Sequence, residues 1–269
     1  MAAYDLLELA LDGHGGLERW RAAREVRIRM RSGGLVFAAR EPLRRHGHAG
    51  GTVHFSTDEP RTVFYPSADP NFPAPIDDGQ VGVYDKGSVR IEGSSGQALA
   101  RRDRARAAFA GLRRQLWWDR LDAIYFKGYA LWNYIAAPFM FTRSGFQLRE
   151  GKPFRHRDEV WRTLEVTFPD DVPTHSREQT FYFNERGILR RLDYVAEVIG
   201  SYAVSAHSLY DHKTFDGIVV PTRRKVTPRI GQRAAPGPAM IWIRIDEFKL
   251  IPRTGDRRAD LDEPRSQSS

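Results

Sequence analysis

Three side chains that could transfer a proton or hold a polar group lie near the C-terminal end of the chain. Asp193, His207 and Arg223 belong to neighbouring strand-like segments, and alternation along each segment can bring the three to one patch. A His–Asp pair beside an arginine can act as a general acid and base with a cation that stabilises an oxyanion. The same three groups could instead bind the polar end of a ligand, or form a salt-bridge ladder on a solvated sheet face.

An aromatic stripe in the middle of the chain is the strongest single feature of the sequence. Its members share one helical face, provided that Gly128 does not interrupt the helix: Trp118, Tyr125, Tyr129 and Trp132. Such a stripe either packs on a sheet as core or lines a cavity for a lipid-like or polycyclic ligand. We therefore treat the four aromatic residues as candidate ligand-binding residues.

Three further residues complete the candidate ligand-binding set. His175 lies in a turn between strands, where it could reach the mouth of a pocket or simply stabilise the turn. Arg223, with His207, would hold the polar end of a ligand. Tyr194 alternates with Asp193, so it would take that role only if the opposite sheet face is the concave one.

Metal and cofactor chemistry finds little support in the sequence. His46, His48 and His54 have a spacing that a hairpin could turn into a metal site, but exposed or packed histidines are the simpler interpretation. The chain has no cysteine, so disulfides and thiolate ligands are excluded. Phosphate-binding glycine loops, zinc-protease motifs and calcium loops are also absent from the sequence. We expect no cofactor and no metal.

The net charge of +8 comes from 42 basic residues, of which only six are lysine. The densest basic segment, 101–114, has interleaved acidic residues and no nucleic-acid-binding motif beside it. We interpret this segment as a solvated helix face and expect no specific nucleic-acid partner. Peripheral contact with an anionic membrane stays open, as does the oligomeric state.

The periodicity of the chain predicts a mainly β protein with two helical blocks. Helices are expected at 4–12, at 15–23 and within 103–137, and the segment 66–79 should be a loop. Strands are expected from residue 26 and at 35–41, 45–48, 52–56, 61–65, 81–84, 88–92, 160–168, 179–184, 189–198, 202–210, 218–227 and 239–249. We expect a single large curved antiparallel sheet or unclosed barrel, with helices covering its concave face. Residues 1–251 should form one domain and 252–269 a flexible tail.

Several local motifs resemble those of one protein family. A short helix with the sequence 15–20, GGLERW, leads into a long alternating strand. Segment 181–189, FYFNERGIL, forms a strand, an acidic turn and a second strand, and 215–221, FDGIVVP, leads into a late strand. This layout resembles the LolA/LolB-like (lipoprotein-carrier-like) superfamily. The resemblance implies an unclosed barrel that is covered by helices and carries acyl chains.

Three functions follow as hypotheses, of which the last is a purely structural or interaction protein with a packed interior. The first is a binding protein for a hydrophobic small molecule or acyl chain, held between the curved sheet and the aromatic helix. The second is a cofactor-independent isomerase, cyclase or lyase that acts on an apolar substrate through the His207–Asp193 pair. Because the N-terminal residues 1–5 lack a basic and then apolar signal pattern, we expect a cytoplasmic protein.

Overall fold

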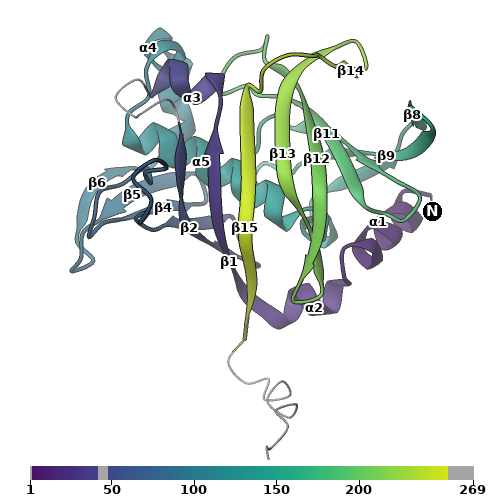
Figure 1. Cartoon of the computed structure of the whole chain (residues 1–269), viewed down its shortest axis with the longest axis horizontal. Coiled ribbons are helices and arrows are strands. Elements are labelled where there is room, and N and C mark those ends of the chain that lie inside the picture. Colours follow the sequence, from purple (N-terminus) through teal and green to yellow (C-terminus); the bar gives the residue numbers. More distant parts are fainter. Residues whose placement is uncertain (1, 42–47, 254–269) are drawn as a thin grey trace, which may run out of the picture.

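One antiparallel sheet organises the molecule (Figure 1). The computed structural model describes residues 2–41 and 48–253. Within these residues the sheet has 15 strands in the order β6-β5-β4-β3-β2-β1-β15-β13-β12-β11-β10-β9-β7, with β14 paired to β13 and β8 to β9. The sheet is strongly curved, and its two end strands do not pair with each other in the described part of the chain. The predicted fold class is therefore confirmed.

The strands follow the hairpin order that the alternating sequence predicts. Their bounds are β1 Ala23–Gly33, β2 Ala49–Ser56, β3 Arg61–Phe64, β4 Val81–Asp85, β5 Ser88–Glu92, β6 Ala98–Arg102, β7 Gln147–Glu150, β8 Phe154–His156, β9 Glu159–Thr167, β10 Glu178–Phe183, β11 Leu189–Val195, β12 Val204–Phe215, β13 Ile218–Ile230, β14 Arg233–Ala234 and β15 Ile241–Pro252. The last strand includes Pro252, so the predicted tail begins later than 252, and its residues from 254 lie outside the described part.

The helices are few, and one of them is central. Within residues 2–41 and 48–253 they are α1 Ala2–Gly13, α2 Leu17–Ala22, α3 Leu35–Arg40, α4 Leu112–Leu116 and α5 Arg120–Ala136, with two short 3₁₀ helices, η2 Ala105–Ala110 and η3 Phe139–Thr142. Helix α5 runs along the concave face of the sheet (Figure 1), and it is buried from Asp122 to its last residue. A helix that is buried all round belongs to the core, and the aromatic stripe explains why.

Gly128 lets α5 approach the sheet closely instead of interrupting the helix. A Cβ atom at this position would lie 2.4 Å from the Cβ of Tyr84 on β4. The carbonyl oxygen of Gly128 accepts a hydrogen bond of 3.0 Å from the hydroxyl of Thr62 on β3. A larger residue here would push the helix off the strands, so glycine is needed for packing.

The turn of the 181–189 motif also has a packing reason. Gly187 has φ of 71°, and a Cβ atom there would lie 2.1 Å from the carbonyl oxygen of Leu9 on α1. Glycine thus permits both the left-handed turn and the contact with the N-terminal helix. The motif that carries the family resemblance therefore fixes α1 against the β10–β11 hairpin.

One of the predicted elements is wrong, and the predicted helical block divides into shorter helices. Segment 35–41 was expected to be a strand, but 35–40 form helix α3, because its apolar residues do not alternate with polar ones and Val36 and Phe37 are buried side by side. The block 103–137 is not continuous helix but contains η2, α4 and α5 in succession. The predicted strand at 45–48 falls largely on residues outside the described part.

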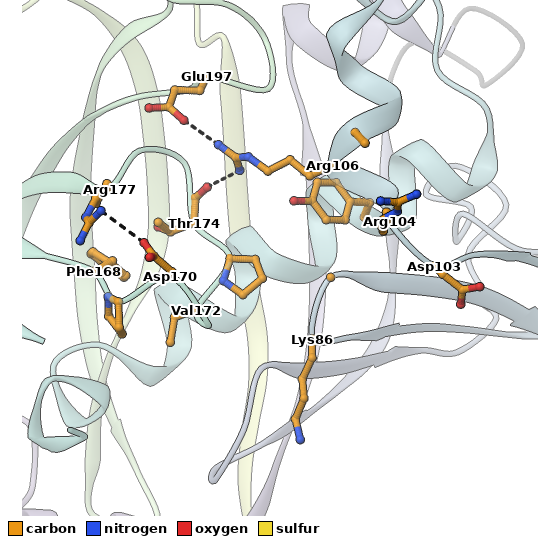
Figure 2. Close-up of a pocket in the computed structure, with 15 residues that line it drawn as sticks. Lys86, Asp103, Arg104, Arg106, Phe168, Asp170, Val172, Thr174, Arg177 and Glu197 are labelled. Carbon is orange, nitrogen blue, oxygen red and sulfur yellow. Dashed lines mark hydrogen bonds and ion pairs between the residues drawn. The ribbon is translucent and has the colours of Figure 1, made fainter. Parts of the chain in front are cut away.

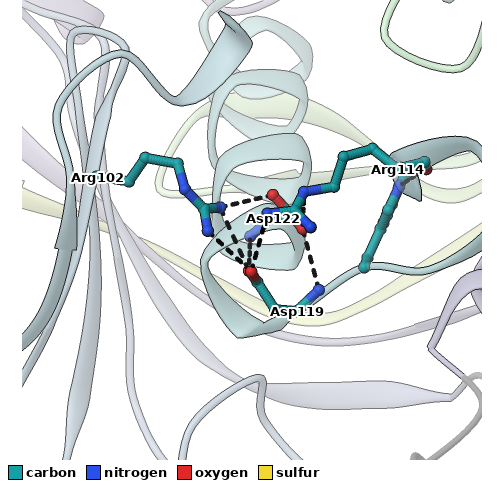
Figure 3. A network of polar contacts seen from close by, with 5 residues as sticks. Arg102, Arg114, Asp119 and Asp122 are labelled. Atoms are coloured by element: carbon teal, nitrogen blue, oxygen red, sulfur yellow. Dashed lines mark hydrogen bonds and ion pairs between the residues drawn. The ribbon is translucent and has the colours of Figure 1, made fainter. Parts of the chain in front are cut away.

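An ion-pair network surrounds the N-terminus of α5 (Figure 3). Asp119 and Asp122 form a capping box, in which each carboxylate accepts a hydrogen bond from the backbone N–H of the other. The fully buried Asp122 carboxylate also contacts Arg102 and Arg114, each at 2.6 Å. Because a buried carboxylate is tolerated only with partners, these arginines are structural.

Replacing Asp122 with Ala should lower the free energy of unfolding by about 2–3 kcal/mol, because two arginines lose a buried partner and the capping box loses one of its two hydrogen bonds. Asp119 still pairs with both arginines, which limits the loss. Urea unfolding followed by circular dichroism measures the change. The control is Asp103→Ala, which removes an exposed ion pair with Arg101 and should change nothing measurable. Equal effects of the two substitutions would contradict this role of Asp122.

Candidate functional site

The register of strands β11, β12 and β13 decides which polar residues face the interior. Leu192 pairs with His207, which pairs with Val226, and directly paired residues share a face. By alternation, Tyr194 and Arg224 lie on this same face. It is the concave face, since the Arg224 guanidinium donates a hydrogen bond of 2.9 Å to the carbonyl oxygen of Tyr134 on α5.

The predicted His207–Asp193 pair is wrong. Asp193 pairs with Ala206, the neighbour of His207, and therefore lies on the opposite, outer face. There its carboxylate accepts hydrogen bonds from Arg191 at 2.6 and 2.8 Å and from the Tyr182 hydroxyl at 2.8 Å. Alternation within one strand could not reveal the error, because the face that two strands share depends on their register.

Arg223 is also on the outer face and does not join His207. Its guanidinium pairs with Asp211 at 2.7 Å and lies 4.3 Å from the ring centroid of Tyr210. The adjacent Arg224 takes the inner position instead. The sequence hypothesis named Arg223 instead of Arg224. Because adjacent strand residues face opposite sides of the sheet, this error of one residue placed the cation on the outer face.

Six buried polar residues meet between α5 and the sheet, and we call them the inner polar cluster: Tyr129, Tyr134, His175, Tyr194, His207 and Arg224. The Tyr129 hydroxyl lies 2.9 Å from Nδ1 of His175, and the Tyr134 hydroxyl lies 2.6 Å from Nε2. The Tyr134 hydroxyl is also 2.9 Å from that of Tyr194, whose ring stacks on His175 at 4.2 Å. Three tyrosines thus fix one imidazole from several sides.

Burial keeps the imidazoles of this cluster neutral. It lowers the pKa of His175 to about 3, and the charge of Arg106 adds to the shift. A neutral imidazole has one donor and one acceptor nitrogen, so one tyrosine hydroxyl donates to His175 and the other accepts from it. Burial also lowers the pKa of His207 well below its ordinary value, with Arg224 and His175 contributing. Neither nitrogen of His207 has a hydrogen-bond partner among the described residues.

Arg224 is the one cation of the cluster, and it lacks a counter-charge. Burial lowers the pKa of its guanidinium to about 10, which still leaves it charged at neutral pH. Its Nε and Nη1 atoms have no hydrogen-bond partner, and no carboxylate in 2–41 or 48–253 lies within ion-pair distance. An unpaired buried cation is costly, so this position favours an anionic or strongly polar ligand group.

An apolar cavity of about 170 Å³ lies beside the inner polar cluster, and we call it the inner cavity. His175 and Tyr194 of the cluster line it, together with Phe126 of α5. Its other walls come from α3, from the 196–204 loop and from the ends of β12, β13 and β15: Val36, Arg40, Ala196, Ile199, Tyr202, Ala203, Val204, Ser205, Val226, Pro228, Met240 and Ile241. An apolar space with a polar end is the usual form of a small-molecule site.

The four aromatic candidates occupy several different positions. Trp118 precedes α5, and its indole N–H donates to the carbonyl oxygen of Arg114 at 2.7 Å. Trp132 is buried and donates to the carbonyl oxygen of Ser56 at 2.9 Å. Tyr129 belongs to the inner polar cluster, whereas Tyr125 lines a separate cleft. None of the four lines the inner cavity.

The cleft beside Tyr125 opens at the surface with a volume of about 470 Å³ (Figure 2). Arg106 of η2 spans it, donating to the carbonyl oxygen of Thr174 at 2.7 Å and pairing with Glu197 at 2.6 Å. These bonds join the segment before α4 to the loop that carries His175. Arg106 thereby holds that loop over the tyrosines of α5.

Sequence reasoning missed Arg224 and Tyr134 as site residues. Tyr134 follows Trp132 by two residues, so the helical stripe excluded it, yet a helix buried all round uses every face. The adjacent Arg223 and Arg224 carried a usable signal. Only one of two neighbouring strand residues can face solvent, so one arginine of such a pair is buried or near the interior.

Metal-ligating clusters and membrane-spanning helices can be assessed in the described residues. His46 lies outside them, and no group of three or more metal-ligating side chains occurs within 2–41 and 48–253. None of the helices in this part of the chain is long and apolar enough to span a membrane.

Comparison with solved structures identifies the fold. A LolA superfamily protein from Nitrosomonas europaea superposes with a TM-score of 0.53 at 14% identity, covering 92% of this chain and 93% of that one. The chain has a LolA-like fold. A DUF1329 family protein from Desulfovibrio piger gives a TM-score of 0.47 at 11% identity, with 92% of both chains covered. No protein-family model and no curated protein sequence matches the chain.

The comparisons also correct the predicted cytoplasmic location. A putative outer membrane lipoprotein-sorting protein domain from Vibrio parahaemolyticus gives a TM-score of 0.46 at 8% identity, with 97% of both chains covered. The expectation of a cytoplasmic protein is therefore withdrawn, since it finds no support among the neighbours that share this fold. The prediction failed because it rested on a missing signal pattern rather than on a feature of the LolA-like fold.

Stability of this LolA-like protein should fall as the pH is lowered from 7 to 5. The unfolded chain binds protons at its histidines below about pH 6.5, whereas folded His175, with a pKa of about 3, does not. His175 alone should cost about 2 kcal/mol at pH 5. His14 and His212, whose pKa values burial lowers to about 4, act in the same direction.

Urea unfolding at pH 7 and pH 5 measures this loss for the native protein and for His175→Gln. The variant is expected to be less stable at both pH values, but its loss between them should be smaller by about 2 kcal/mol. An unchanged pH dependence in the variant would contradict the burial of a neutral His175.

Proposed function

We propose that the protein binds a hydrophobic small molecule or acyl chain with an acidic head group. The apolar part lies in the inner cavity, and the head group reaches Arg224 and His207 behind Tyr194. The observation that carries the proposal is the unpaired buried guanidinium of Arg224 in the inner polar cluster, whose members His175 and Tyr194 line the apolar cavity. An acidic group would supply the counter-charge that the described residues lack.

The site matches the sequence hypothesis in outline but not in its residues. The inner cavity lies between Phe126 of α5 and strands β11 to β13, which corresponds to a ligand held between the helix and the curved sheet. His175 and Tyr194 contribute to it, whereas Arg224 replaces Arg223 as the cation. We keep 1–251 as one ligand-binding domain within this proposal.

The volume of the inner cavity limits the size of the ligand's apolar part. A cavity of about 150 Å³ lined by aliphatic and aromatic side chains is known to hold benzene, so about 170 Å³ accommodates a short apolar segment. Apolar burial would contribute about 25 cal/mol per Å². A longer chain would extend past Tyr202 and Met240 toward solvent, since both line the cavity near its edge.

The second hypothesis, a cofactor-independent enzyme, loses the pair on which it rested. His207 and Asp193 lie on opposite faces of the sheet. His207 therefore acts in our proposal as a neutral hydrogen-bonding group for the ligand head rather than as a general base.

Arg224→Met should weaken the binding of octanoic acid by about tenfold or more, because a charge-assisted contact is lost. It should leave the stability of the ligand-free protein unchanged or raise it, because the substitution removes an unpaired buried charge. Isothermal titration calorimetry measures the affinity, and octanamide, a neutral ligand of the same length, should bind the native protein and the variant equally well.

The matched control is Arg223→Met, which removes the same charge one residue away on the outer face. It should change the affinity for octanoic acid by no more than about twofold. If both variants bind octanoic acid as tightly as the native protein, Arg224 does not hold the head group. If the native protein binds neither octanoic acid nor octanamide, the binding proposal itself fails.

A further inference from the structure

A second cleft, on the outer face of the sheet, has a composition unlike the rest of the surface. Its volume is about 500 Å³, and strands β8, β9, β11, β12 and the β14 hairpin enclose it. Five arginines line this outer cleft, and none of its described lining residues is acidic: Arg155, Arg157, Arg190, Arg191 and Arg233. The chain as a whole has 34 acidic residues, so their absence from this cleft is a local feature.

A β-bulge places two of these arginines side by side. Tyr182 pairs with Arg191, but the next residue of β10, Phe183, pairs with Leu189, so β11 has one extra residue at this point. Leu189 and Leu192 are both buried toward the core, and the two arginines between them therefore both point outward. Without the bulge, Arg190 would face the interior.

One of the five arginines already has bonding partners within the protein. Arg191 forms two hydrogen bonds with Asp193 and lies between two rings, 5.2 Å from the centroid of Phe154 and 5.0 Å from that of Tyr182. The other four arginines form no ion pair with any carboxylate in the described part of the chain. Arg190 in addition has a buried Nε atom that lacks a hydrogen-bond partner there.

The nearby carboxylates are occupied by other groups. Asp193 is held by Arg191, and Asp211 is held by Arg223. Glu159 accepts a hydrogen bond of 2.5 Å from the indole N–H of Trp161. None of these carboxylates forms an ion pair with the four unpaired arginines of the cleft.

The wall of the cleft also offers flat aromatic surface. His156 stacks on Trp161, with centroids 4.3 Å apart and planes 19° from parallel. Planar guanidinium groups bind phosphate through paired, charge-assisted hydrogen bonds, and a phosphate monoester carries enough charge to engage several of them at once. A carboxylate would leave most of these arginines without a partner.

We propose that the outer cleft binds a phosphate group, held mainly by Arg190 and Arg233 with Arg155 and Arg157 closing the other side. The phosphate belongs either to a soluble phosphorylated molecule or to a lipid head group, since both present the same oxygens. The cleft lies on the face opposite to the inner cavity, so this site does not depend on the hydrophobic ligand or on Arg224.

The test uses two probes of defined chemistry. Inorganic pyrophosphate, titrated by calorimetry at moderate salt, represents the soluble source. Phosphatidylcholine vesicles with and without phosphatidic acid, used in flotation, represent the lipid source. The variant Arg190→Gln/Arg233→Gln should reduce the binding of whichever probe the native protein binds by about tenfold or more.

The matched control is Arg29→Gln/Arg101→Gln, which removes two exposed arginines elsewhere and gives the same net charge. It should bind the probe within about twofold of the native protein. A second variant, Arg155→Gln/Arg157→Gln, changes a different hairpin and guards against misfolding of the first. Its melting temperature should match that of the native protein, while its binding is reduced.

The outcomes separate the possibilities. Binding of pyrophosphate without binding to phosphatidic acid vesicles indicates a soluble ligand, and binding to these vesicles that the site variant loses indicates a lipid head group. An equal loss in the site variant and in the control would show attraction to the net charge of +8 and would overturn the proposal. Failure of the native protein to bind either probe would overturn it as well.

Discussion

The burial of a whole helix inside a curved sheet is the constraint on which the rest of the structure depends. Helix α5 has polar residues on several faces, and each of them needs a partner away from water. Lys127 pairs with Glu41 at 2.8 Å, and Asp122 pairs with two arginines. Tyr129 and Tyr134 both contact His175, and Tyr134 also contacts Tyr194. The charged side chains buried along the helix thus have partners within an aromatic core.

Arg224 differs from these buried charged residues because its charge has no partner among the described residues. Most buried polar groups around α5 are satisfied within the chain, whereas the Arg224 guanidinium has one described hydrogen bond and no counter-charge. A protein that satisfies the other charges of its core so fully has little structural reason to keep this one. The contrast supports a ligand-binding role for Arg224 more strongly than its burial alone.

Much of the fold could be predicted from the sequence, because hairpins leave a clear local signal. Strict alternation and glycine turns located most strands, and the motif at 181–189 led to the LolA-like fold. Helix α3 could not be predicted, since its five apolar residues in succession fit a buried strand equally well. The short strands β8 and β14 also lack any periodic signal.

The candidate site was harder to predict than the fold for a physical reason. His175 and Tyr194 were identified from residue type and strand parity, and they do meet. The pairing of His207 with Asp193 required the register between two strands, which a single sequence does not specify. The choice between Arg223 and Arg224 failed for the same reason. The outward position of Arg190 depends on a bulge, which a single sequence does not specify either.

The close contact between Gly128 and Tyr84 limits how the interior can change shape. With its backbone against the sheet and Lys127 tied to the end of α3, the helix has no room to slide or turn. Helix α3, which forms one wall of the inner cavity, is held by the same Lys127–Glu41 ion pair. Another wall of the inner cavity is the 196–204 loop, which spans Gly200 and the exposed Tyr202. In the proposed function, a ligand that enters from solvent would displace this loop rather than the helix.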